Sequence, residues 1–293
     1  MEQDIVVEGQ APDEVSPEVT PSGAKRFIVL AGVLALVVGA LAVGLSSSSS
    51  LANAASIVRA ALVSSIGDKT VAFTLDEQIS GAVSVDVTGN GACDFSSGDC
   101  NMTMNYGGQF ASIGQATAIF ANGTAYISFS GALAAQMPTQ WVSLPLNVKS
   151  INQSSALGSS ENPLAGLAEL AQKGDQVTDD GLVNGGGTSL HEYTVAVSAS
   201  AAQSQASTAL KNLPSWLSRT ASTSSLGGAT MQVYIDNAGQ LARIVAHVSA
   251  SAAGKSLGVV ETEVMTGYGA PVSVTVPSSD QVTPVANLLN SLT

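Results

Sequence analysis

Every second residue is apolar along much of the chain after position 70, and this alternation constrains the fold more than any other feature. Three stretches show it most clearly, with the apolar members Val71, Phe73 and Leu75, then Val83, Val85 and Val87, then Cys100, Met102 and Met104. Successive side chains of a strand point to opposite sides, so each stretch predicts a strand with one apolar and one wet face. The chain is therefore predicted to build a sheet with one buried side.

Turn signals join these strands directly into hairpins. Asn122-Gly123 supplies the positive φ angles of a type I′ turn, and Asp236 to Gly239 predicts a second hairpin turn. Because strands adjoin without intervening helices, they pair antiparallel and not as βαβ units. We predict an α+β fold, a single large curved antiparallel sheet or half-barrel of roughly 10 to 11 strands covered by a few helices. Helical patterns cover 55–67, 162–174, 199–213 and 280–292, and one further strand pattern covers 270–277.

An uncharged apolar run covers residues 27–45, directly after the basic pair Lys25-Arg26. As a helix it is about 28 Å long, close to the roughly 30 Å of a bilayer's hydrocarbon core. The positive-inside rule keeps the basic end in the cytoplasm, so we expect a single-pass signal anchor with the main domain outside the cell membrane. The alternative is a signal peptide cleaved after Ala54, at the end of an Ala-x-Ala sequence, which would release a secreted domain.

The apolar run divides the chain into four predicted parts. Residues 1–26 form an acidic, disordered cytoplasmic tail and residues 27–45 the transmembrane helix. A Ser-rich linker covers 46–54, and 55–293 form one extracytoplasmic domain. Residues 55–293 show no change in composition that would indicate a boundary between two domains.

The charge of the chain argues against nucleic acid as a partner. The formal net charge is -12, and residues 51–293 hold sixteen acidic against eight basic residues without a basic cluster. Binding to phosphate backbones needs such a cluster of positive charge.

Two cysteines, Cys93 and Cys100, lie on either side of a polar, Gly-containing turn. Their position on adjacent predicted strands favours a cross-hairpin disulfide formed in an oxidising compartment, with a pair of free thiols as the alternative. A metal site needs further ligands, and neither His191 nor His247 has suitable spacing to supply them. We expect no metal and no cofactor.

Catalysis is not expected from this sequence. The chain has no Gly-x-Ser-x-Gly sequence, and both His191 and His247 fall within predicted strands, where a histidine is usually structural. A hydrolase using one of these histidines is the least favoured hypothesis.

The composition leaves the nature of the core open. Charged residues make up 11% and aromatic residues 4% of the chain. A sheet face with few large side chains leaves unfilled volume unless its elements approach closely or a guest fills it. The alternatives are an apolar cavity between sheet and helices that hosts acyl chains, and an ordinary dry core.

Several short stretches occur in an order typical of one family. They are "ANGTAYISFSGALAAQMPTQWVSLPL", "NPLAGLAELAQ", "HEYTVAVSAS", "MQVYIDNAGQLARIVAHV" and "GYGAPVSVTVP". This succession resembles the LppX/LprG-type envelope lipoproteins, relatives in fold of the LolA lipoprotein carriers, over about residues 55 to 285. The resemblance implies a half-barrel sheet covered by helices around a hydrophobic cavity for lipid acyl chains. The chain departs from the family where a lipidated cysteine is typical, because it has Ser46 to Ser50 there.

The favoured hypothesis is a membrane-anchored external domain that binds a membrane lipid, a lipoconjugate or another amphiphile without transforming it. Its predicted cavity walls are Phe73, Leu75, Val85, Met102, Met104, Ile127, Phe129, Val195, Val233 and Ile235. The alternative is an envelope sensor or scaffold in which the same domain binds a protein partner.

Overall fold

The computed structural model describes residues 53–81, 84–145, 177–185, 187–200, 224–252, 255–285 and 287. The predicted tail, membrane span and most of the linker, together residues 1–52, lie outside this part, as do the predicted helix at 162–174 and most of that at 199–213. Within the described ranges, no helix combines the length and apolar character that crossing a membrane requires.

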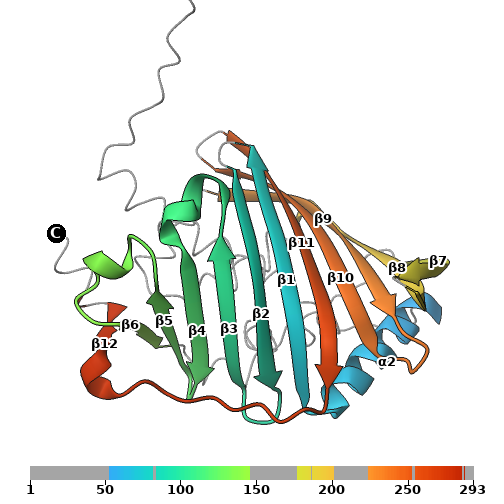
Figure 1. Ribbon diagram of the computed structural model, residues 1–293. Helices are drawn as coiled ribbons and strands as arrows, with labels where there is room; N and C mark the ends of the chain where they lie inside the picture. Colours follow the sequence, from blue (N-terminus) through green and yellow to red (C-terminus); the bar gives the residue numbers. More distant parts are fainter. Residues whose placement is uncertain are drawn as a thin grey trace, which may run out of the picture.

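One curved sheet of twelve strands dominates the described part of the chain (Figure 1). The strands are β1 (Thr70–Gly81), β2 (Val85–Asp94), β3 (Asp99–Tyr106), β4 (Gln115–Ala121), β5 (Thr124–Phe129), β6 (Trp141–Pro145), β7 (Val177–Gly185), β8 (Thr188–Val197), β9 (Ser224–Ile235), β10 (Leu241–Ala252), β11 (Lys255–Tyr268) and β12 (Val282–Pro284). Their order across the sheet is β12-β6-β5-β4-β3-β2-β1-β11-β10-β9-β8-β7. The predicted α+β fold built on one large antiparallel sheet is confirmed.

The sheet consists of two hairpin series that meet at its centre. β1 to β6 follow one another outwards to one side, and β11 back to β7 follow one another to the other side. The pairing of β1 with β11, which are antiparallel, joins the two series (Figure 1). Residues near position 75 therefore lie beside residues near position 263, a juxtaposition that no local sequence pattern reveals.

The C-terminal segment differs from the prediction. Residues 270–277 form no strand, because Pro271 and Pro277 lack the N–H that a ladder needs. This segment instead crosses the ends of the strands towards β6 (Figure 1), and the side-chain amide of Asn101 donates to the carbonyl oxygen of Ser273 at 3.1 Å.

The helix predicted over 280–292 is wrong up to Pro284, whereas the described residues after it, Val285 and Asn287, are helical. Residues Ser279–Gln281 form the short 3-10 helix η3, and Val282–Pro284 form β12, parallel to β6. Pro284 disfavours a helix that would continue through it, because proline lacks the N–H for the helical hydrogen bond. With β12 the sheet has twelve strands, more than the ten or eleven predicted.

Helix α2 (Asn53–Gly67) opens the described chain and confirms the helix predicted at 55–67. Val58, Ala61 and Leu62 are buried against β7, β9 and β10, whereas Ile57 is 42% exposed. The backbone N–H of Leu241 donates to Ser65 Oγ at 2.9 Å, which ties the end of α2 to the start of β10.

Two other helical segments are short 3-10 turns that join neighbouring strands. Gly108–Ile113 forms η1 between β3 and β4, and Ala134–Gln136 forms η2 between β5 and β6. The predicted turn Asn122-Gly123 joins β4 to β5 with φ angles of 53° and 69°, as a type I′ turn requires.

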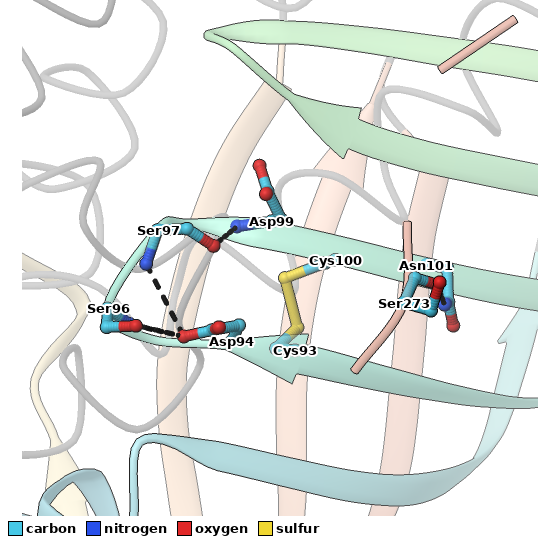
Figure 2. Close-up of a disulfide and its surroundings, with 8 residues drawn as sticks. All are labelled: Cys93, Asp94, Ser96, Ser97, Asp99, Cys100, Asn101 and Ser273. Atoms are coloured by element: carbon cyan, nitrogen blue, oxygen red, sulfur yellow. Dashed lines mark hydrogen bonds between the residues drawn. A yellow bond between two sulfur atoms is a disulfide. The ribbon is translucent and has the colours of Figure 1, made fainter. Parts of the chain in front are cut away.

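The disulfide between Cys93 and Cys100 is present, as predicted (Figure 2). The two residues are direct partners on β2 and β3, with a Cα–Cα distance of 4.1 Å. In the turn between them, Asp94 Oδ1 accepts hydrogen bonds from the backbone N–H of Ser96 at 2.8 Å and from its hydroxyl at 2.5 Å. These bonds lower the pKa of the Asp94 carboxyl. The hairpin is thus closed by both a covalent and a polar contact.

Candidate functional site

The sheet register places all ten predicted wall residues on one face, here called the apolar face. Leu75 lies opposite Gly89 of β2, which lies opposite Met104 of β3, and the same face continues through β4 to Phe129 of β5. On the other side of β1, the face continues through β11 and β10 to Val233 of β9 and on to β8. Whether these residues contact a ligand stays a prediction.

Two buried clusters lie on the apolar face. One packs α2 on β8 to β11 and also includes Ile79 of β1 and Val85 and Val87 of β2. The other joins β1 to β6 around Phe73 and the disulfide. Met104 and Met265 are only half-buried and pack against both clusters, so the face is less sealed where the two clusters meet.

The ten predicted wall residues divide accordingly. Five are buried: Phe73, Val85, Val195, Val233 and Ile235. The other five, on β1, β3 and β5, are half-buried: Leu75, Met102, Met104, Ile127 and Phe129. In a dry core these large apolar side chains would be completely buried, whereas all five are only half-buried.

Large and small residues alternate across the middle of the face in two cross-strand rows. The Leu75 row consists of Leu75, Gly89, Met104, Ala116 and Phe129. The Phe73 row consists of Phe73, Gly91, Met102, Ala118 and Ile127. β2 and β4 thus contribute glycine and alanine between the bulky residues of β1, β3 and β5.

Gly91 is required by the packing of the Phe73 row. A Cβ added there would lie 2.6 Å from Cζ of Phe73 and 2.7 Å from the carbonyl oxygen of Asn101. The ring of Phe73 therefore lies over the position that any side chain on Gly91 would need.

Three glutamates lie on the apolar face where β1 and β11 meet. Glu77 and Glu261 are direct cross-strand partners, and Glu263 lies opposite Leu75, at the end of the Leu75 row. Glu77 is 3% and Glu263 is 7% exposed, while Glu261 is partly exposed. Oε1 of Glu77 is buried and has no hydrogen-bond partner. Three carboxyl groups are thus held in a largely apolar setting, which we call the glutamate trio.

Burial controls the protonation of the glutamate trio. It raises the pKa of Glu77 and of Glu263 to about 7. The pKa of Glu261 is raised well above its ordinary value by burial and, in addition, by repulsion from the other two carboxylates. At neutral pH the carboxyls of Glu77 and Glu263 are therefore near the midpoint of their titration.

The other titratable groups near the trio are tyrosines. Burial raises the pKa of Tyr106 to about 12, with a further contribution from the negative charge of Glu77. Burial likewise raises the pKa of Tyr268 to about 12, and its hydroxyl donates to the carbonyl oxygen of Leu241 at 2.6 Å. Both are neutral at physiological pH, and no basic side chain acts on the pKa of any of the three glutamates.

Sequence reasoning missed the glutamate trio, although part of its signal is visible. Glu77 is in phase with the apolar members Phe73 and Leu75 of its strand, and Glu261 and Glu263 are in phase with Val259 and Met265. An acid at an apolar position of a strand predicts a buried carboxyl. The meeting of the three acids depends on the β1–β11 pairing, which joins residues far apart in the chain.

The two histidines lie apart from the trio. Nε2 of His191 donates to Asp179 Oδ1 at 2.6 Å, lowering the pKa of Asp179, and the ring of His191 stacks on Tyr193 with centroids 4.7 Å apart. His247 is exposed on β10. Across the described ranges, no three or more His, Cys, Asp or Glu residues lie close enough to hold a metal ion.

The comparisons with known proteins give only distant similarity. No protein-family model and no curated protein matches the chain. Among solved structures, lipoprotein LppX from Mycobacterium tuberculosis is similar with 13% identity and a TM-score of 0.42, over 75% of this chain and 97% of that one. LprF from Mycobacterium bovis has 12% identity and a TM-score of 0.39, over 79% and 100% of the two chains. The S-type phycobiliprotein lyase CPES from Guillardia theta has 5% identity and a TM-score of 0.24, over 74% and 99%. At these scores the similarities carry no argument about function.

Proposed function

We propose that this domain binds a lipid or another amphiphile along the apolar face and leaves it chemically unchanged. The observation that carries the proposal is the half-burial of five large apolar side chains in the Leu75 and Phe73 rows. An alkyl chain laid along a row gains about 0.8 kcal/mol for each methylene that it removes from water. Several methylenes suffice for useful affinity.

The shape of the rows supports an elongated guest. From β5 to β1 a row crosses four strand spacings of about 4.8 Å, or about 19 Å in all. The glycines and alanines of β2 and β4 lie between larger side chains along this length. An acyl chain has a narrow, apolar cross-section that fits along the half-buried side chains of such a row.

The location of the domain is part of the proposal. The apolar run at 27–45 anchors it to the cell membrane from outside, unless the chain is cleaved after Ala54. With the anchor retained, the linker of 46–54 reaches at most about 30 Å, so the domain takes up and presents its lipid near that membrane. The disulfide is compatible with an oxidising, extracytoplasmic setting.

Lipid extraction from the purified full chain tests this proposal. Wild-type protein taken from its native membrane is expected to carry a stoichiometric amphiphile, identified by mass spectrometry. The double variant M102Q/M104Q, which makes half-buried positions polar at nearly constant size, is expected to carry at least about tenfold less, since each replaced thioether contact removes on the order of 1 kcal/mol of apolar burial.

The matched control changes the opposite face of the same strand. T103Q/N105Q alters residues between and beyond the two methionines and is expected to retain the lipid. Equal retention by both double variants, or an empty wild-type protein, contradicts the proposal. An empty protein that instead cross-links to one stable protein partner supports the sensor or scaffold alternative.

A further inference from the structure

We propose that the amphiphile carries a protonated amine at its polar end, held by the carboxyl groups of Glu77, Glu261 and Glu263. This inference rests on the function proposed above and names the chemical class of the ligand. It concerns the three acidic side chains on the apolar face, whose presence there is not explained by contacts with an alkyl chain alone.

The position of the trio fits the polar end of an elongated guest. The Leu75 row runs from Phe129 on β5 to Leu75 on β1, and its next position, on β11, is Glu263. Glu261 lies two residues before Glu263 on β11, and its direct cross-strand partner on β1 is Glu77. An alkyl chain along the row therefore has its end within one strand spacing, about 4.8 Å, of the trio.

The trio lacks the partners that would make it a purely structural feature. Oε1 of Glu77 is buried without a hydrogen bond, and in the described part of the chain no hydrogen bond joins any two of the three carboxyls. No basic side chain acts on the pKa of any of them. Buried charges in proteins are normally paired, so an arrangement of unpaired carboxyls indicates a missing positive partner.

The charge and spacing of the trio select among ligands. Anionic headgroups are repelled by the carboxylates and are excluded. A single metal ion is not favoured either, because the three groups do not form a metal-ligating cluster. A neutral hydroxyl can donate one hydrogen bond but leaves the mutual repulsion of the carboxylates in place. A protonated amine donates up to three hydrogen bonds and offsets that repulsion.

The proposal carries a pH dependence with a definite sign. The groups that face the trio are its own three carboxyls and the neutral tyrosines Tyr106 and Tyr268. With pKa values of about 7, the carboxyls of Glu77 and Glu263 are charged above pH 7 and neutral by about pH 5. A primary alkyl amine, like a lysine side chain with a pKa of about 10.4, stays protonated over this whole range.

Photoreactive alkyl probes on the full chain in phospholipid nanodiscs test the inference. Three probes share one diazirine-bearing alkyl chain and differ only in an amine, hydroxyl or carboxylate end, and labelled peptides are mapped by mass spectrometry. At pH 8 the amine probe is expected to label the apolar face at least about tenfold more than the hydroxyl probe, as for hydrogen bonds to a charged group, and the carboxylate probe least. At pH 5 the amine and hydroxyl probes are expected to label equally.

Conservative variants separate the headgroup site from the alkyl site. E77Q/E261Q/E263Q is expected to reduce amine labelling at pH 8 to the level of the hydroxyl probe and to leave hydroxyl labelling unchanged. The wild-type pH series makes the same test without any variant, should the triple variant fail to fold. Equal labelling by amine and hydroxyl probes on wild type at pH 8 overturns the amine site while leaving the proposed function intact. Absence of labelling by every probe overturns both.

Discussion

Replacing Glu77 by glutamine should stabilise the protein at high pH and leave it unchanged at low pH. Burial raises the pKa of Glu77 from 4.5 to about 7. A carboxyl with a raised pKa binds its proton more tightly in the folded state, so the folded state loses relative stability as pH rises through this interval. At 1.36 kcal/mol per pKa unit, the loss amounts to about 3 kcal/mol, complete above pH 7 and absent below pH 4.5. Glutamine is neutral at every pH, so the E77Q variant does not lose this stability as pH rises.

Urea unfolding of the delipidated full chain, followed by far-UV circular dichroism at pH 4.5 and pH 8, measures this effect. E77Q should exceed wild type in free energy of unfolding by about 3 kcal/mol at pH 8 and match it at pH 4.5. The matched control D76N changes the neighbouring, exposed residue of β1 and should stay within about 0.5 kcal/mol of wild type. A wild-type stability that rises between pH 4.5 and 7, or an E77Q effect equal at both values, refutes the reasoning.

Two further substitutions test the packing of the apolar face. Gly91→Ala should lower the free energy of unfolding by about 1 to 3 kcal/mol, because its Cβ would lie 2.6 Å from the Phe73 ring. The control Gly267→Ala has open space at its Cβ and should leave the stability nearly unchanged. Equal effects of the two substitutions in thermal melts would contradict the register. Changing Cys93 and Cys100 together to alanine should cost about 2 kcal/mol through loop-closure entropy, and unchanged stability under oxidising conditions would show that the bond does not form.

Local patterns in the sequence were sufficient for the strands and for most turns. The alternation around Phe73 and Met102, the Asn122-Gly123 turn and the cysteine pair each depend on neighbours in the chain, and all three have the predicted structure. The C-terminal segment could not be predicted this way. Its alternating valines have the pattern of a strand, but two prolines and the position of β6 make residues 270–277 cross the sheet instead of joining it.

The sequence predicted only the part of the candidate site that depends on the local pattern of each strand. Alternation places Leu75, Met104 and Phe129 on an apolar side of their own strands, and the register then brings these strands together in one row. The glutamate trio depends instead on the pairing of β1 with β11, between residues 77 and 261. Only tertiary structure reveals that these acids share a site, and that glycine and alanine of β2 and β4 separate the bulky residues.

The central claim is that an acyl chain lies on the apolar face, and site-specific cross-linking measures it most directly. p-Benzoylphenylalanine is introduced at position 102, which faces the rows, or at position 103, which faces the opposite side of β3, in the full chain in its native membrane. After irradiation, the account predicts a lipid adduct from position 102 and none from position 103. Adducts of equal yield from both positions, or protein adducts alone from position 102, would contradict it.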